Sequence, residues 1–559
     1  MKKISSARTI VARHDPVLWV AMFAAVAITL IGANWGLYEA WNADQMGFRC
    51  LTCVENQPLN PGWFLKPPFF SYLVLVFAKI PASLLEAALN LDSSTGDMIA
   101  LLLARTLNAL LFALTCAVGY AVLKPVAGLW PARLFAVALA TSAGFVAFAH
   151  FLTTEISVTL FMLIAFWFSA RILHGARLAD YVAAGFIVGV ATATKYNGLA
   201  VGIGIPIAHI LALRPGTLRE LISAGFDHRL ILGVAAVIPG FVFANPYALL
   251  DYPQFTSDFL YNYVTTPVYS GMAEGNSYLD FLAAFVEIFG WPLCLVITAG
   301  VFLIAVGWAR GQFTRDQKHL VVLLSGTFLL YFYKFGSFPR FETRFALPVA
   351  PLVLMLAMVP LRGFQPGRLL AVGFPIAAYG VLCGTLVGLQ FRADPRMDAI
   401  RWAKTVPREA RVEKTSYTPD FSRSPGFEAV LVSTPWISGR VRLLSAVAED
   451  LDVGDKLRKS EREEQIDWYS EAALYERRPD FIALNSLYYK RFFSAPMNTL
   501  YPELQDFYSR LLDEDFCYRT VFDQQSSSVP KWAYPQRIDF LKNRMVIQEL
   551  DEACFEAGA

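Results

Sequence analysis

Charged side chains are scarce in this sequence of 559 residues, of which they make up only 17%. In a typical soluble protein, Asp, Glu, Lys and Arg account for about a quarter of the residues. The mean hydropathy is high, at +0.43. The net charge is only +2, and no basic patch is interleaved with aromatic residues, so nothing indicates a nucleic-acid partner. This composition predicts an integral membrane protein.

Cysteine is also infrequent, with seven in the whole chain. Those that lie in apolar runs, where burial as small hydrophobic residues is expected, are Cys116, Cys294 and Cys383. Cys50 and Cys53 form a CxxC, but no second such pair exists to complete a zinc site. Cys517 and Cys554 lie near the C-terminus. Outside the cytoplasm either pair could form a disulfide, and the sequence leaves both open.

Long apolar runs fill the chain up to residue 391, each with the roughly 17–25 residues needed to cross a bilayer. We expect about eleven transmembrane helices. They lie near residues 17–39, 98–122, 131–149, 154–172, 178–194, 197–213, 229–247, 281–307, 319–335, 345–361 and 369–391. The apolar segment 69–78 ends at Lys79 and is too short to span, so it is predicted to be interfacial or re-entrant.

The chain therefore divides into a transmembrane domain, residues 1–392, and a soluble domain, residues 393–559. The soluble domain has short strand-like segments at 427–432 and 480–484 and helix-like segments at 466–475 and 501–512, which predict a small α/β fold. Two roles are open for it, a stabilising lid over the membrane domain or recognition of an acceptor.

Basic residues mark one side of the membrane. If the N-terminus is cytoplasmic, every loop on that side carries Lys or Arg, and nearly every one is short. The first loop, 40–97, and the soluble domain then lie outside, in the periplasm of a bacterium or an equivalent space. The first apolar run has no small-residue cleavage site and is expected to remain as a span.

Ionisable residues gather at the predicted outer ends of the spans, where they are functional candidates because burying them is costly. The carboxylates are Asp44 and Glu155, and the cations are Lys66, Lys195, Arg340 and Arg344. Such cations suit a phosphate, and a carboxylate can act as a general base. For Glu155 the alternative is an ordinary helix-start carboxylate, and for Lys195 a side chain that reaches the lipid headgroups.

Aromatic residues accompany these charges and could stack on a sugar ring. The tyrosines proposed to line the substrate are Tyr196, Tyr247, Tyr263 and Tyr269. His150 is either an interfacial histidine or a ligand for a divalent metal, and the sequence does not decide between them. These residues together predict displacement at a sugar carbon, with a lipid phosphate leaving.

The order of several motifs resembles the GT-C glycosyltransferases, in particular the protein O-mannosyltransferase and aminoarabinose–lipid A transferase superfamily. The motifs are Asp44 after the first span, Lys66-Pro67-Pro68, Thr-Thr-Glu-Ile at 153–156, Thr-Lys-Tyr-Asn-Gly at 194–198 and Arg-Phe-Ala-Leu-Pro at 344–348. The resemblance covers residues 15–390. It implies an inverting hexosyl or pentosyl transferase that uses a polyprenyl-phosphate sugar and an extracytoplasmic protein, lipid or glycan acceptor.

By this resemblance Asp44 is the catalytic carboxylate, Glu155 is the second acidic residue, and the four cations contact the carrier phosphate. Two positions depart from the family pattern. Gln45 replaces a common acidic residue after Asp44, and Leu65 stands where some bacterial members have an acidic residue before Lys-Pro-Pro. The second departure removes a potential metal ligand, so no metal is assigned.

Two other functions remain as alternatives. A transporter of lipid-linked sugars would show charges at mid-span and an internal repeat, and no repeat is evident. A ligase that moves an oligosaccharide from a polyprenyl diphosphate would need the same cations. The identity of the sugar and of the acceptor is not readable from the sequence.

Overall fold

The computed structural model describes residues 15–37, 41, 57, 59–270, 277–338, 342–423, 426–437, 465–526 and 541–558, with the backbone alone at 264–270, 423 and 557–558. Within these residues, eight helices are long and apolar enough to cross a membrane, or up to ten if each of two bent pairs counts as one span. The chain is a polytopic helical membrane protein, as predicted.

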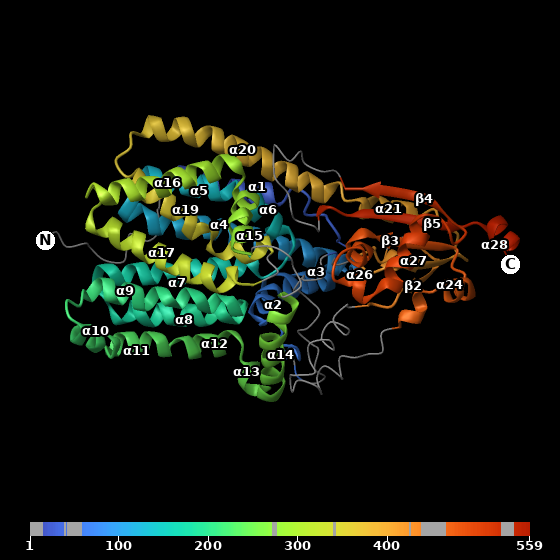
Figure 1. The fold of residues 1–559 in the computed structure, drawn as a ribbon, viewed down its shortest axis with the longest axis horizontal. Coiled ribbons are helices and arrows are strands. Elements are labelled where there is room, and N and C mark those ends of the chain that lie inside the picture. The colour runs from blue at the N-terminus through green and yellow to red at the C-terminus, as the bar shows by residue number, and fades with distance from the viewer. Residues whose placement is uncertain are drawn as a thin grey trace.

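The membrane domain is a bundle of helices whose axes run along the long dimension of the molecule (Figure 1). Its first half comprises α1 (Pro16–Thr29), α4 (Ser93–Ala127), α5 (Leu129–Ala140), α6 (Ala143–His150), α7 (Glu155–Gly175), α8 (Leu178–Thr194), η3 (Tyr196–Ile203), α9 (Gly204–Leu213), α10 (Leu218–Gly225), α11 (His228–Ala235) and α12 (Val237–Ala244). Its second half comprises α15 (Ser277–Phe289), α16 (Trp291–Ala309), α17 (Arg315–Gly336), α18 (Thr343–Ala346), η4 (Leu347–Val349), α19 (Ala350–Met358), η5 (Val359–Leu361) and α20 (Pro366–Arg392).

Small residues let neighbouring helices of the bundle approach closely. A Cβ atom on Gly185 of α8 would lie 1.7 Å from the carbonyl oxygen of Gly233, and one on Gly240 of α12 would lie 2.0 Å from that of Phe186. Backbone contact of this kind is typical of membrane helices, which associate by close packing rather than by the hydrophobic effect.

The predicted single span at 281–307 is wrong, because the chain there forms two helices. Gly290 separates α15 from α16 with a φ of 76°, and Pro292 follows in the first turn of α16. Only glycine adopts this backbone conformation without strain. The predicted span at 131–149 is likewise bent, by 48° between α5 and α6.

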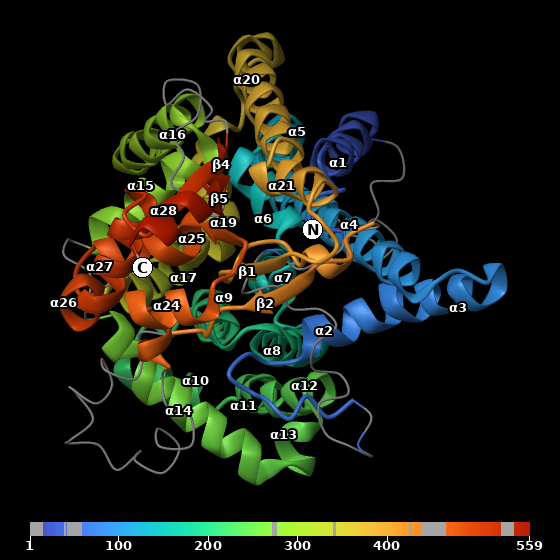
Figure 2. The same cartoon turned by 90° about the vertical axis from the view of Figure 1, so that its right-hand side faces the viewer.

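A second helical segment, α2 (Phe69–Val74), η2 (Leu75–Lys79) and α3 (Ile80–Leu89), runs without a break for 21 residues. It is longer than the segment predicted from Lys79 and Pro81, because Pro81 lies in the first turn of α3, directly after the π-helical turn of η2. By length and composition it could span a membrane. Figure 2 shows α2 and α3 lengthwise, extending away from the rest of the bundle, and the interfacial position of the segment stays a prediction.

The C-terminal part contains a five-stranded sheet with the order β2-β1-β3-β5-β4. The strands are β1 (Arg411–Lys414), β2 (Val430–Ser433), β3 (Phe481–Asn485), β4 (Tyr518–Gln525) and β5 (Arg544–Leu550). β1 pairs in parallel with β2 and β3, and β5 pairs antiparallel with β3 and β4. Helices such as α24 (Glu471–Arg477) and α27 (Pro502–Leu512) pack beside the sheet, which confirms the predicted α/β fold.

A disulfide and a buried hydrogen-bond network stabilise this domain. The open question about Cys517 and Cys554 is answered by a disulfide that joins the start of β4 to α28 (Glu552–Gly558). A second set of contacts lies where the domain follows the membrane bundle. There the Asp394 carboxylate accepts hydrogen bonds from Arg396 at 2.7 Å, from the Trp35 indole at 2.8 Å and from Asn543 of the sheet domain at 3.1 Å. Arg396 is fully buried and lies against the Trp35 ring.

Candidate active site

The carboxylate and two of the cations predicted from the sequence meet at the end of the bundle that faces the C-terminal domain. Glu155 begins α7 and is only 2% exposed. Its Oε1 accepts a hydrogen bond from the Lys195 ammonium at 2.8 Å. Lys195 directly follows α8, so the pair closes the ends of two adjacent antiparallel helices. Lys195 and Arg344 are the two cations whose charge acts on Glu155.

A phenylalanine ring lies beside both cations. The Lys195 Nζ atom is 5.7 Å from the centroid of the Phe345 ring, and the Arg344 Cζ atom is 5.6 Å from it. Arg344 also forms an ion pair with Glu342 at 2.6 Å. Both cations therefore lie beside the same aromatic ring, and each forms an ion pair with a carboxylate. The side chains of Lys195 and Arg344 remain 23% and 24% exposed, so both can meet a ligand.

Tyr331 of α17 connects the segments that carry these cations. Its hydroxyl accepts a hydrogen bond from Asn197 Nδ2 at 2.7 Å and donates one to the Phe345 carbonyl oxygen at 2.9 Å. The Tyr331 side chain is 1% exposed. A buried hydroxyl with both partners satisfied fixes the spacing of the two segments, since breaking either bond leaves a polar group without a partner.

Glu287 of α15 provides a second connection on the same side. It is 3% exposed and accepts a hydrogen bond from the hydroxyl of Thr343, the residue before Arg344. The helix start at α18 is thus tied to α15 as well as to α17.

The Lys-Pro-Pro segment is held by side chains from two other parts of the chain. The Tyr196 hydroxyl donates to the Phe64 carbonyl oxygen at 2.6 Å, and Asn262 of α14 (Tyr252–Ser270) donates to the Leu65 carbonyl oxygen at 3.1 Å. The Phe64 amide donates to Asp258 at 2.7 Å. The backbone just before Lys66 is therefore positioned by hydrogen bonds to side chains. One of these side chains, Tyr196, is adjacent to Lys195 in sequence.

The other tyrosines predicted to line the substrate are placed differently. Tyr247 begins α13 (Tyr247–Leu250). Tyr263 is on α14 and is 71% exposed. Tyr269 also lies on α14, and its side chain is outside the described residues. Tyr196 is connected to the Lys-Pro-Pro segment through its hydrogen bond to the Phe64 carbonyl oxygen.

His150 ends α6 and is 1% exposed. Its Nδ1 lies 2.7 Å from the Val146 carbonyl oxygen and its Nε2 lies 2.8 Å from that of Ile31. Both ring nitrogens are thus engaged with backbone oxygens, which does not suit a metal ligand. In the part of the chain that the structure describes, no group of three or more His, Cys, Asp or Glu residues could hold a metal ion.

Three predictions cannot be checked against the geometry. Asp44, Arg340 and the Cys50–Cys53 pair lie outside the described residues. Their roles remain predictions from the sequence.

Sequence reasoning missed Tyr331 and Glu287. Glu287 gave a usable signal, since a carboxylate within an apolar run is a functional candidate by itself. Tyr331 gave none, because a tyrosine in an aromatic-rich span is usually packed in the core or placed at the membrane interface.

This arrangement can bind an anion at the end of the helix bundle that faces the C-terminal domain. Two partly exposed cations lie beside an aromatic ring, and the ion pair with buried Glu155 fixes one of them. An oxyanion such as a phosphate would meet positive charge at Lys195 and Arg344, and Arg offers it a bidentate fork.

Comparison with known proteins agrees with this picture. The family model described as dolichyl-phosphate-mannose-protein mannosyltransferase matches residues 97–243. The matched segment includes both Glu155 and Lys195. No curated protein sequence matches the chain.

Two crystal structures of ArnT from Cupriavidus metallidurans have a similar fold. The apo structure aligns with a TM-score of 0.52 at 15% identity over 96% of this chain and 98% of that one. The structure bound to undecaprenyl phosphate aligns with a TM-score of 0.52 at 16% identity over 95% and 98%. The resemblance to GT-C glycosyltransferases of the protein O-mannosyltransferase and ArnT type is therefore confirmed for the fold and for the matched segment.

Proposed function

We propose that this GT-C-fold chain is an inverting glycosyltransferase that moves one sugar from a polyprenyl-monophosphate carrier to an acceptor outside the cytoplasm. The fold and the matched mannosyltransferase segment support the glycosyltransferase class. The ArnT crystal structure with bound undecaprenyl phosphate supports a polyprenyl phosphate as the carrier.

The single observation that carries the proposal is the position of Lys195, paired with Glu155, and of Arg344 beside the same Phe345 ring. It supplies two cations for one phosphate group at the end of the bundle that faces the C-terminal domain. We assign Lys195 and Arg344, with Lys66 and Arg340, to the phosphate of the donor. Their positive charge stabilises the negative charge that develops on the leaving phosphate.

The role of Glu155 is refined by its geometry. It is almost completely buried and its Oε1 is bonded to Lys195, so it is better placed to orient that cation than to contact an acceptor. The general base is assigned to Asp44. In the reaction, the acceptor oxygen or nitrogen bonds to the anomeric carbon, the bond from that carbon to the phosphate oxygen breaks, and the acceptor proton passes to Asp44.

The test is a turnover assay on the purified protein with radiolabelled polyprenyl-monophosphate sugars, hexoses and pentoses, and a membrane extract as acceptor source. Acceptor-dependent release of free polyprenyl phosphate is expected from one donor. A parallel reaction with EDTA decides whether a divalent metal is needed. Release from none of the donors, with folded protein, would contradict the proposal.

The same protein preparation discriminates the two alternatives. An oligosaccharide ligase would release polyprenyl diphosphate from a diphosphate-linked oligosaccharide. A transporter would move the lipid-linked sugar across proteoliposomes without cleaving it. We expect neither activity. The cations of the site lie at one face rather than along the helices, which disfavours a transporter. The bound undecaprenyl phosphate in the ArnT crystal structure supports a monophosphate carrier over a diphosphate one.

A further inference from the structure

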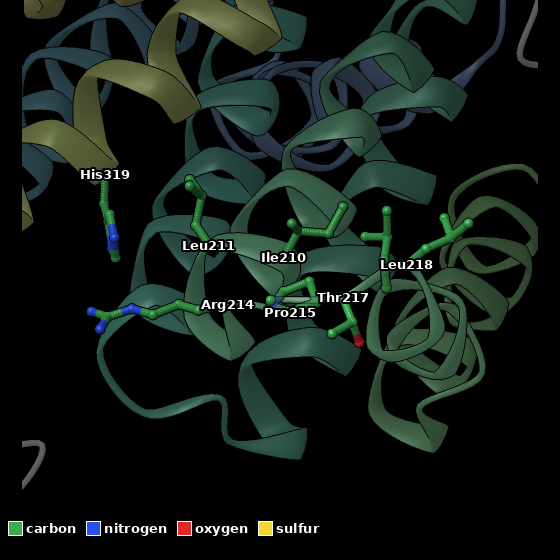
Figure 3. Close-up of a pocket in the computed structure, with 9 residues that line it drawn as sticks. Ile210, Leu211, Arg214, Pro215, Thr217, Leu218 and His319 are labelled. Carbon is green, nitrogen blue, oxygen red and sulfur yellow. The ribbon is translucent and has the colours of Figure 1, made fainter.

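A groove of about 480 Å³ lies at the end of the bundle remote from the C-terminal domain, and the proposed active site does not use it. It is formed where α9 ends, where the 214–217 turn leads into α10, and where α17 passes with His319 (Figure 3). Its lining combines apolar side chains, among them Leu211, Leu218 and Leu221, with the basic side chains Arg214 and His319.

The two basic side chains converge at one end of the groove. Figure 3 shows the Arg214 guanidinium and the His319 ring on the same side of Leu211, while Leu218 lies toward the opposite end. The groove therefore has a polar end and an apolar end, as an amphipathic ligand would require.

Among the described residues Arg214 has no acidic partner, in contrast to two other arginines at this end of the molecule. Arg171 pairs with Asp180 at 2.7 Å, and Arg229 pairs with Asp227 at 2.6 Å. Within the described ranges, the Arg214 guanidinium makes no ion pair or hydrogen bond. Glu220, which follows the 214–217 turn, accepts a hydrogen bond from the Gly216 amide at 2.7 Å.

At the apolar end of the groove, large apolar side chains are exposed, which is unfavourable in water. Leu218 is 73% exposed, and Ile222, one turn further along α10, is 56% exposed. Arg219 and Glu220 provide charged positions on the same short helix. A helix with one charged and one apolar face at the end of a transmembrane bundle is suited to the interface between headgroups and acyl chains.

We propose that this groove binds one anionic phospholipid of the cytoplasmic leaflet. The lipid phosphate lies between Arg214 and His319, and the start of an acyl chain covers Leu218 and Leu221. Basic pockets between transmembrane helices on the cytoplasmic side are suited to such headgroups. The apolar wall favours a lipid over a free phosphate, because a soluble anion would leave Leu218 and Leu221 in water.

The test compares phosphatidylglycerol with phosphatidylcholine of the same acyl chains, using native mass spectrometry of the full-length protein in detergent. We expect the wild type to retain phosphatidylglycerol in preference. Arg214→Gln should lower its retention about fivefold, the effect of one basic residue near an anionic lipid surface.

The matched control is Arg219→Gln, because Arg219 is also exposed, lies five residues away and does not line the groove. It should retain phosphatidylglycerol as the wild type does. Leu218→Gln changes no charge, and its exposed position makes it compatible with folding, so it should weaken retention through the apolar wall alone.

Three results would overturn the proposal. They are equal retention of the two lipids by the wild type, equal losses in Arg214→Gln and Arg219→Gln, and competition by glycerol phosphate as effective as competition by the lipid. The equal losses would show that the basic residues act only as a diffuse surface charge. The glycerol phosphate result would assign the site to a soluble anion.

Discussion

The Tyr331 hydroxyl donates a hydrogen bond to the Phe345 carbonyl oxygen at 2.9 Å, and this contact ties α17 to the segment that carries Arg344. The same hydroxyl accepts from Asn197, two residues after Lys195. The spacing of the two cations thus depends on one buried oxygen atom. A phosphate held between Lys195 and Arg344 would sense any change in that spacing.

Tyr331→Phe is therefore expected to raise the KM for the lipid-linked donor about tenfold, while the KM for the acceptor changes little. The substitution keeps the ring and removes only the hydroxyl, so Asn197 and the Phe345 carbonyl lose their partner. A misplacement of about 1 Å at a reacting group can cost up to about a hundredfold in rate. Steady-state kinetics with each substrate varied in turn measure the two KM values.

The control for Tyr331→Phe is Tyr181→Phe. The Tyr181 hydroxyl is bonded at 2.7 Å to buried His209, so its loss also leaves a buried polar group without its partner. Each variant should lose about 1–3 kcal/mol of stability. If Tyr181→Phe raised the donor KM as much as Tyr331→Phe, the effect would come from stability and not from the position of the cations.

The Glu155–Lys195 pair allows stability and function to be separated. Lys195→Met leaves a buried carboxylate without its cation and should cost about 3–5 kcal/mol. Glu155→Leu combined with Lys195→Met replaces the pair by apolar side chains and should restore most of the stability, because the charges no longer need to be desolvated.

Thermal unfolding and donor turnover of the same samples check this expectation. The double variant should unfold near the wild-type temperature and remain inactive. A stable and active double variant would show that neither residue takes part in the reaction.

The disulfide between Cys517 and Cys554 closes a loop of 37 residues and should stabilise the C-terminal domain by about 3–4 kcal/mol. Cys517→Ser together with Cys554→Ser should lower the unfolding temperature of that domain, whereas Cys294→Ser, which removes a free cysteine, should not. Maleimide labelling of protein from membranes should reach Cys517 only after reduction. Labelling without reduction would contradict the disulfide and the proposed extracytoplasmic position of the domain.

Much of the fold was readable because the bilayer imposes a simple rule of length and polarity. The predicted span that contains Glu155, and the span that ends just before Lys195, lie within a few residues of α7 and α8. The break at Gly290 was missed, since a glycine in an apolar run looks the same whether its φ is positive or negative. Helix α3 was missed because Lys79 and Pro81 together resemble a helix end.

The charged residues of the candidate site could be predicted from the sequence, but the hydrogen bonds that connect them could not. Lys195 and Glu155 were assigned to one face by the alternation of loops, although 40 residues separate them. The bond between Asn197 and Tyr331 joins residues 134 positions apart, and nothing in the local sequence of either marks it. For His150 the sequence leaves two roles open, and the geometry argues against the metal ligand, because both ring nitrogens face carbonyl oxygens.

Donor turnover by Asp44→Asn, measured beside Asp97→Asn, tests the central claim most directly. Asp97 is a half-exposed carboxylate paired with Lys79 at 2.8 Å, and no role in the reaction is assigned to it. Loss of a general base should lower release of polyprenyl phosphate by about a hundredfold to ten-thousandfold in Asp44→Asn, while Asp97→Asn should match the wild type. Equal turnover in the two variants would contradict a transferase that uses Asp44.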